Sequence, residues 1–159
     1  MGIERHPKML EQLRRHEGLR LAPYRCPAGF LTVGYGHNLD ADPVPGMERI
    51  SALTEGEAEA LLQRDTDACG RALDAAFPVW RSLVEARQAV LLNMAFNLGV
   101  QGLLRFTRTL EAVKRGDFET AAREMLDSKW RRDVKGRALE LAEQMRSGCW
   151  QSVPQSGKG

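Results

Sequence analysis

Three side chains with acid–base or hydrogen-bonding chemistry lie close together near the start of the chain: Glu17, Cys26 and Thr32. A carboxylic acid such as Glu17 can deliver a proton to a leaving group. The Thr32 hydroxyl can donate and accept a hydrogen bond, and the Cys26 thiol becomes a base or nucleophile once it loses its proton. Their joint action depends on the elements that position them.

A short helix is predicted to end at Glu17. Pro7 suits the first turn of a helix, where its missing N–H costs no hydrogen bond, and Gly18 suits the position just after a helix end. A carboxylate in the last turn meets the negative end of the helix dipole, which is locally unfavourable. A helix built for stability would carry Lys or Arg there. Glu17 is therefore either a functional acid or a solvated surface residue.

A β-hairpin is predicted from Leu21 to Gly36, with a short glycine-containing loop at residues 27–29. This loop places Cys26 opposite Phe30. Because side chains alternate between the two faces of a strand, Cys26 and Thr32 lie diagonally on one face, within about 8 Å. The alternatives are a small apolar residue at the hairpin corner for Cys26 and an ordinary β-branched strand residue for Thr32.

The rest of the chain is predicted to be mostly helical. Residues 38–51 form an irregular connection, with a short strand around Glu48–Ile50. Thr54 and Glu57 have the spacing of a capping box, which starts a helix lasting to about Ala76. Further helices are expected over Leu83–Leu98, Leu103–Arg115, from Asp117 onward, and over Arg137–Met145. The fold class is therefore α+β, predominantly helical, and the residues after Trp150 are expected to be disordered.

Composition narrows the class of protein. The chain has 159 residues, 43% of them hydrophobic and 28% charged, which is typical of a globular domain. The net charge of +2 is too small to indicate a nucleic-acid partner. The charged N-terminus predicts no signal peptide, and no stretch predicts membrane insertion. Neither the three cysteines nor the histidines His6, His16 and His37 have the spacing of a zinc site.

The segment around these residues resembles the active-site region of the phage lysozymes, glycoside hydrolase family 24. The family's signature is Glu, eight residues, Asp or Cys, five residues, Thr, which here is Glu17, Cys26 and Thr32. The flanking Glu-Gly-Leu-Arg-Leu and Thr-Val-Gly-Tyr-Gly-His runs also match. The resemblance covers nearly the whole chain. Two departures are Cys26, where the best-known members have Asp, and a shorter connection between His37 and Thr54.

The resemblance implies a two-lobed, lysozyme-like fold over residues 1–150. The N-terminal lobe spans about 15–55, a linking helix about 55–76, and a helical C-terminal lobe about 77–150 together with helix 7–17; residues 151–159 form the tail. It also implies a muramidase that cleaves the β-1,4 bond between N-acetylmuramic acid and N-acetylglucosamine in peptidoglycan, with inversion.

The resemblance further assigns roles to individual residues. Glu17 is the general acid, Thr32 holds the attacking water, and Cys26 activates or orients that water. Supporting roles fall to a His37–Asp65 ion pair and to Arg137 as a neighbour of Glu17. Substrate contacts fall at four positions, each of which also has a purely structural interpretation: Asn38, Phe96, Thr109 and Glu124.

No cofactor or metal is implied. The expected biological role is that of an endolysin: a monomer that accumulates in the host cytoplasm, is released through a holin and then acts on the cell wall. The alternatives are a lytic transglycosylase, which gives 1,6-anhydro products, and a cell-wall-binding module without catalysis. Thr32 at the water-holding position argues against the first, and an intact Glu17 argues against the second.

Overall fold

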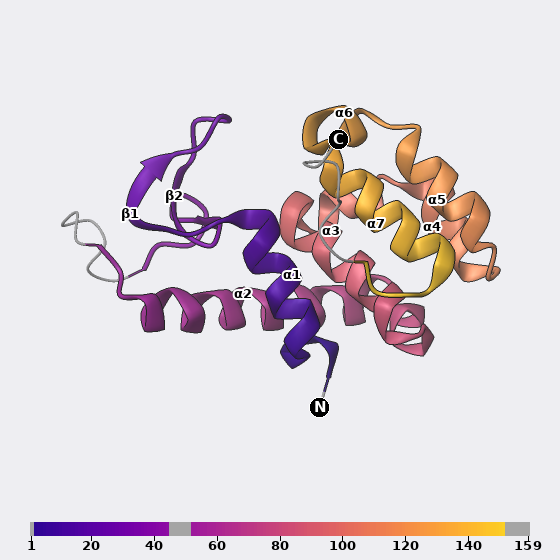
Figure 1. The fold of residues 1–159 in the computed structure, drawn as a ribbon, viewed down its shortest axis with the longest axis horizontal. Helices are drawn as coiled ribbons and strands as arrows, with labels where there is room; N and C mark the ends of the chain where they lie inside the picture. Colours follow the sequence, from indigo (N-terminus) through magenta and orange to yellow (C-terminus); the bar gives the residue numbers. More distant parts are fainter. Residues whose placement is uncertain (1, 45–51, 152–159) are drawn as a thin grey trace. The chain divides into compact units, whose positions relative to one another are not determined.

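The computed structural model describes residues 2–44 and 52–151. The chain divides into two compact units, Met1–Ala68 and Cys69–Gly159. Within the described ranges the elements are mostly helical with one small sheet, so the predicted fold class is confirmed (Figure 1). The strand predicted around Glu48–Ile50 lies outside the described residues, as do residues 152–159 of the tail.

The first unit opens with a 3-10 turn, Ile3–Arg5, and helix α1, Pro7–Glu17. The His6 ring accepts a hydrogen bond from the Lys8 N–H at 3.1 Å and so caps the helix start. At the other end Gly18 has a φ of 70°, a conformation that favours glycine. The predicted helix, with Glu17 as its last residue, is confirmed.

The sheet has three antiparallel strands in the order β1 (Arg20–Arg25), β2 (Leu31–Gly34) and β3 (His37–Asn38). The predicted hairpin is confirmed: the Gly29 N–H donates to the Cys26 carbonyl at 2.8 Å, which closes a turn over residues 26–29. Gly29 has a φ of 90°, as expected of the glycine that follows a type I turn in a three-residue loop. The third strand, β3, is not predicted from the sequence.

Helix α2, Glu55–Ala76, begins with the predicted capping box. The Glu57 N–H donates to Thr54 Oγ1 at 3.1 Å, and the Thr54 N–H donates to Glu57 Oε1 at 2.8 Å. The first turns of α2 pack on the sheet through an apolar cluster, whose buried members are Val33, Leu39, Leu53, Ala58 and Leu61. Leu31 also packs on this cluster, so one face of β2 is turned toward the apolar core of the unit.

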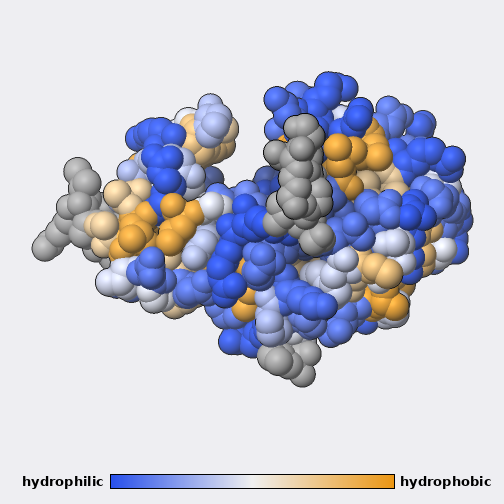
Figure 2. Space-filling model, in the orientation of Figure 1, coloured by the Kyte–Doolittle hydropathy of each residue, from blue (hydrophilic) through white to orange (hydrophobic). Residues whose placement is uncertain are grey.

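The second unit is helical, and α7 packs against α3, α5 and α6 (Figure 1). Its elements are η3 (Pro78–Ser82), α3 (Glu85–Leu104), α4 (Thr107–Lys114), α5 (Phe118–Leu126), α6 (Lys129–Val134) and α7 (Gly136–Ser147). On the face shown in Figure 2 hydrophilic side chains predominate on each unit, while the core of this unit is apolar, with Trp80, Leu91 and Met145 fully buried.

One predicted helix in this unit starts at the wrong residue, and one observed helix was not predicted. The helix predicted over Leu103–Arg115 exists as α4, but its predicted start is wrong, because α3 continues to Leu104 and the chain breaks at Arg105 and Phe106 before α4 begins at Thr107. Phe106 leaves the helical conformation and its ring meets the Trp130 ring edge to face, with centroids 5.9 Å apart. Helix α6 is not predicted, although Ser128 caps it by accepting a hydrogen bond from the Arg131 N–H.

The predicted end of the central helix is confirmed in modified form. Gly99 has a φ of 75° and a ψ of 156°, which kinks α3 at the predicted position, but a further helical segment follows. Within residues 2–44 and 52–151, no single helix is long and apolar enough to cross a membrane. The pair α3 and α4 meets that test only jointly, with a bend of 99°.

Candidate functional site

The carboxyl group of Glu17 lies directly against Gly36, in the turn between β2 and β3. A methyl group placed on Gly36 would come within 2.5 Å of Glu17 Oε1 and 3.2 Å of its carboxyl carbon. Gly36 also has a φ of 73°. Glycine is therefore required here twice: for the backbone conformation and for the close approach of the carboxylate. The end of α1 and the turn before β3 together set the position of Glu17.

Cys26 and Thr32 share one face of the hairpin, as predicted. Tyr24 is the register partner of Thr32, and the Cys26 N–H donates to the Phe30 carbonyl at 2.9 Å. Opposed residues in an antiparallel pair point to the same face. Thr32 Oγ1 also donates to the Phe30 carbonyl, at 2.9 Å. The Thr32 hydroxyl is thereby held in a fixed orientation beside the thiol.

Asn38 belongs to the same surface. It is the register partner of Thr32 across the β2–β3 pair, so it lies on the face that carries Thr32 and Cys26. We call this surface, which bears Cys26, Thr32 and Asn38, the Thr32 face. The side chain of Asn38 accepts a hydrogen bond from the Ala41 N–H at 3.0 Å, which fixes its orientation. Three of the predicted site residues are thus neighbours on one small sheet.

The surroundings of Cys26 lower the pKa of its thiol. Partial burial acts in the opposite direction and raises it, but hydrogen bonds to the sulfur, chiefly from the backbone of Phe30 and Ala28, outweigh that effect. Hydrogen bonds to the charged form of an acid favour that form. The hairpin turn therefore favours a thiolate at Cys26.

His37 and Asp65 form the ion pair that the family resemblance implies. His37 Nδ1 lies 2.6 Å from Asp65 Oδ2, and His37 Nε2 lies 2.8 Å from the Asp42 carbonyl. The ring is buried, with 4% of the side chain exposed. Desolvation lowers the pKa of His37, but its hydrogen bonds to Asp65 and Asp42 prevail and the pKa is raised above its ordinary value. The pair links β3 to helix α2, because His37 is the first residue of β3, directly after Gly36, and Asp65 lies on α2.

Among the described residues, His37, Asp42 and Asp65 form a group whose side chains could offer ligands to a metal ion. Atoms of His37, Asp42 and Asp65 lie within 4.8 Å of one another. Both ring nitrogens of His37 already have hydrogen-bond partners, and Arg64 contacts both carboxylate oxygens of Asp42, at 2.9 and 3.1 Å. A cation would have to displace these contacts. The group is arranged as an ion-pair network, whose hydrogen bonds favour the protonated form of His37.

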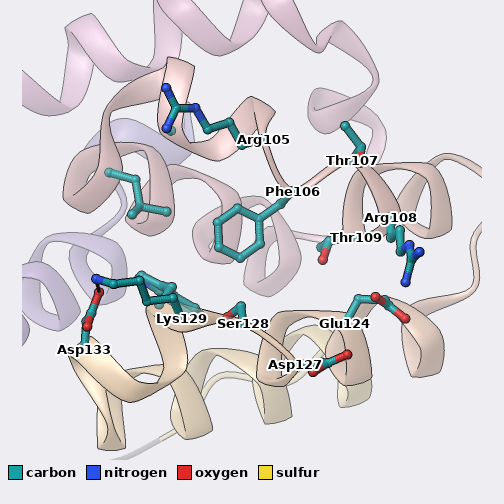
Figure 3. A pocket seen from close by; sticks show the side chains of 13 residues that line it. Arg105, Phe106, Thr107, Arg108, Thr109, Glu124, Asp127, Ser128, Lys129 and Asp133 are labelled. Carbon is teal, nitrogen blue, oxygen red and sulfur yellow. Dashed lines mark hydrogen bonds and ion pairs between the residues drawn. The ribbon is translucent and has the colours of Figure 1, made fainter.

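In the second unit, the structure brings two of the predicted substrate contacts together. Thr109 on α4 and Glu124 on α5 both line a cavity of about 460 Å³. Figure 3 shows the Phe106 ring and the Thr109 hydroxyl pointing into it from one side, with Ser128 and Glu124 on the other. Glu124 is half-buried, whereas Thr109 is only 1% exposed. We call this hollow the α4–α6 cavity, after the helices that enclose it.

Phe96 and Arg137, the remaining predicted site residues, lie elsewhere in this unit. Phe96 is half-buried on α3 and is not one of the residues that line the α4–α6 cavity. Arg137 Nε donates to Asn93 Oδ1 at 3.0 Å, and this links α7 to the buried Asn93 on α3. The expected proximity of Arg137 to Glu17 stays a prediction.

Some site features were missed by reasoning from the sequence. Gly36 belongs to the Thr-Val-Gly-Tyr-Gly-His run, but nothing in the run indicates that the carboxyl of Glu17, before the hairpin, lies against it. Phe106 fits the apolar pattern of the helix predicted over Leu103–Arg115, so the pattern gives no sign of the break there. Asp42 lies in the predicted irregular connection, where no regular pattern indicates that its backbone carbonyl meets the His37 ring.

Comparison with known proteins identifies similar sequences over most of the chain. The family model described as phage lysozyme matches residues 14–147. An endolysin of Acyrthosiphon pisum secondary endosymbiont phage 1 is 32% identical over 137 residues, which cover 84% of this chain and 85% of the endolysin. A probable T4-type lysozyme of Dictyostelium discoideum is 23% identical over 158 residues, with 87% and 93% covered.

One relative is much longer than this chain. The pre-baseplate central spike protein Gp5 of Enterobacteria phage T4 is 36% identical over 152 residues. The match covers 84% of this chain but 26% of the spike protein, so the chain spans about a quarter of that relative. The same sequence pattern therefore occurs both in proteins of similar length and within a larger one.

Proposed function

Because the chain belongs to the phage lysozyme family, we propose that it hydrolyses the β-1,4 bond between N-acetylmuramic acid and N-acetylglucosamine in bacterial peptidoglycan. The main support is the Thr32 face, where a hydroxyl of fixed orientation lies beside a thiol whose pKa is lowered. The Glu17 carboxyl is held against Gly36 in the same unit. These are an acid, a water-binding group and a base.

In the proposed reaction, Glu17 donates its proton to the leaving glycosidic oxygen as the bond from C1 to that oxygen breaks. A water molecule attacks C1 from the opposite face, so the configuration at C1 inverts. The Thr32 hydroxyl already donates its proton to the Phe30 carbonyl, so its oxygen is available to accept a hydrogen bond from this water. The Cys26 thiolate takes the water's second proton, the one that is not hydrogen-bonded to Thr32, and becomes a thiol.

No cofactor or metal takes part in this scheme. Each cycle begins with Glu17 protonated and Cys26 deprotonated. At its end Glu17 takes a proton from solvent and Cys26 releases one to it. Asn38, Phe96, Thr109 and Glu124 are proposed to contact the substrate. His37 and Asp65 would keep β3 in place, and Arg137 would lie near Glu17.

Product analysis tests the reaction. Purified peptidoglycan is digested in ordinary and in oxygen-18 water by the wild-type protein and by Glu17→Gln, and the released muropeptides are analysed by mass spectrometry. Labelled reducing ends that disappear in the variant would support hydrolysis with Glu17 as the acid. Unlabelled 1,6-anhydro products would instead identify a lytic transglycosylase, and binding without release would indicate a non-catalytic module. The anomer that forms first, followed by NMR, tests inversion.

We further propose that the protein acts as an endolysin. The support comes from relatives in two different phages, one named an endolysin and the other a SAR-endolysin. In this role it is a monomer that accumulates in the host cytoplasm and reaches the wall through a holin. Expression in bacteria with and without a holin tests this: lysis only when both are present supports it, whereas lysis by the chain alone contradicts holin dependence. The similarity to a spike protein favours a second role, as the wall-cleaving part of a larger assembly.

A further inference from the structure

The Phe30 ring is a large apolar side chain that the fold leaves in contact with water. It is 49% exposed, and within the described residues only Val84 and Leu139 are large hydrophobic side chains of similar exposure. Phe30 directly precedes β2, and two residues of that strand, Leu31 and Val33, pack in the core cluster. Since successive side chains point to opposite faces, Phe30 points away from that core.

The backbone of Phe30 is at the centre of the polar groups of the Thr32 face. Its carbonyl accepts hydrogen bonds from both the Cys26 N–H and the Thr32 hydroxyl, each at 2.9 Å. Its backbone also contributes a hydrogen bond that lowers the pKa of the Cys26 thiol. The ring is therefore attached to the residue that orients the proposed base and the proposed water-binding group, and it lies on their face of the hairpin.

The hairpin tip that carries the ring is held by the side chains of Arg25, on β1, and Asp40, just after β3. Arg25 Nη1 donates to the Gly29 carbonyl at 3.1 Å and lies 3.6 Å from Asp40 Oδ2. The same Asp40 oxygen accepts the Leu31 N–H at 2.9 Å. A ring on a fixed backbone loses less conformational entropy when it binds a ligand than one on a mobile loop.

The Phe30 ring differs from its aromatic neighbour Tyr24. The guanidinium of Arg20 lies 4.2 Å from the centre of the Tyr24 ring and covers one of its faces. Within residues 2–44 and 52–151, no cation and no second ring packs on Phe30. Of these two aromatic rings, Phe30 is the one with neither face covered by a cation or a second ring among the described residues.

We propose that the Phe30 ring is a stacking platform for a sugar ring of the glycan chain, next to the bond that is cleaved. In β-1,4-linked N-acetylhexosamines the ring substituents are equatorial, so the C–H bonds form an apolar, slightly positive face. The face of an aromatic ring is negative and attracts such a surface. Phe30 would thereby place the sugar over Cys26 and Thr32 as a positioning residue. The inference rests on the proposed function.

The test compares Phe30→Ala and Phe30→Trp with the wild type, and uses Leu139→Ala, a side chain of similar exposure in the other unit, as the matched control. Dye release from labelled peptidoglycan sacculi gives the half-saturating substrate concentration and the maximal rate. Phe30→Ala should raise the former about three- to tenfold, as expected for the loss of one aromatic contact, and change the maximal rate less than twofold. Phe30→Trp should restore wild-type saturation, and Leu139→Ala should have no effect.

A second measurement separates this inference from the proposed function. Binding to intact sacculi is followed by sedimentation in a Glu17→Gln background, which needs no turnover. Weaker binding after Phe30→Ala supports the platform even if the reaction proves not to be hydrolysis. If the wild type cleaves peptidoglycan while Phe30→Ala binds and cleaves normally, the platform is wrong and the function stands. A fall in maximal rate with unchanged saturation and binding would also overturn it, because that result indicates a structural role in the hairpin.

Discussion

The Thr32 face in the first unit and the α4–α6 cavity in the second are built in different ways. The Thr32 face takes its side chains from one short stretch of chain. The side chains of Thr32 and Asn38 are oriented by hydrogen bonds to backbone groups two or three residues away. The cavity is enclosed by residues from Leu98 to Asp133, on several helices. Local geometry thus sets the proposed chemistry, whereas the proposed substrate contacts in the second unit depend on helix packing.

This difference predicts how substitutions act. A substitution that shifts Glu17, Cys26 or Thr32 changes the position of a proposed reacting group and should lower the rate of reaction. A substitution in the cavity removes one of several contacts with substrate. It should therefore raise the half-saturating substrate concentration, and by a smaller factor than the loss of rate expected for the reacting groups.

The largest effect is expected for Gly36→Ala. The added methyl group would overlap with Glu17 Oε1 and displace the carboxyl, and a misplacement of about 1 Å at a reacting group can cost on the order of a hundredfold in rate. Gly116→Ala is the matched control, because Gly116 has the same φ of 73° and no atom within 4 Å of the added methyl. Both variants should lose similar stability in urea unfolding. Equal activity in the two would contradict the positioning of Glu17 by Gly36.

Substitutions of Cys26 should have the next largest effect. Cys26→Ser should lower kcat/KM by roughly ten- to a hundredfold, because a serine hydroxyl does not act as a base near neutrality, while Cys26→Asp should retain part of the activity. Activity of the wild type should rise with pH as the Cys26 thiol, whose pKa is lowered, loses its proton. In Cys26→Asp this rise should move to the carboxylate range, near pH 4.

The other cysteines provide the control for this series. Cys69 and Cys149 also carry free thiols, and their replacement by serine should leave the pH–rate profile unchanged. Full activity of Cys26→Ala would show that Cys26 is a small apolar residue of the hairpin corner and no more.

The ion pair behind the sheet should contribute to stability in a pH-dependent way. Because the pKa of His37 is raised in the folded protein, the pair stabilises fully below the pKa of the unfolded state, about 6.5, and the contribution is lost as pH rises through the folded value. Asp65→Asn should therefore cost about 1.5–3 kcal/mol at pH 5.5 and less at pH 8.5. Urea unfolding at several pH values measures the difference.

Asp67→Asn is the control on the same helix, since Asp67 pairs with Arg5 at 2.9 Å. Arginine stays charged throughout this range, so the small cost of that change should be independent of pH. A cost for Asp65→Asn that is equally flat, or that grows with pH, would contradict a protonated His37.

The same contrast explains what could be predicted from the sequence. The end of α1, the three-residue hairpin loop and the Cys26–Thr32 diagonal follow from turn chemistry and the two-residue period of strands, which act over a few positions. The capping box at Thr54 was predicted for the same reason. The break at Phe106 follows from packing on Trp130, a residue in another helix, so local propensity favoured a continuous helix. The cavity depends on that break.

The smallest effect is expected in that cavity, for Glu124→Gln. A single polar contact made by a half-buried side chain contributes on the order of 0.5–1 kcal/mol, so the half-saturating peptidoglycan concentration should rise about two- to fivefold with the maximal rate unchanged. Glu119→Gln is the matched control, because Glu119 lies on the same helix but its side chain is 71% exposed and lines no part of the cavity. If both variants saturate like the wild type, Glu124 is a solvated helix residue. If Glu124→Gln instead lowers the maximal rate as strongly as a change on the Thr32 face does, the cavity takes part in the reaction itself, and the division between the two regions is wrong.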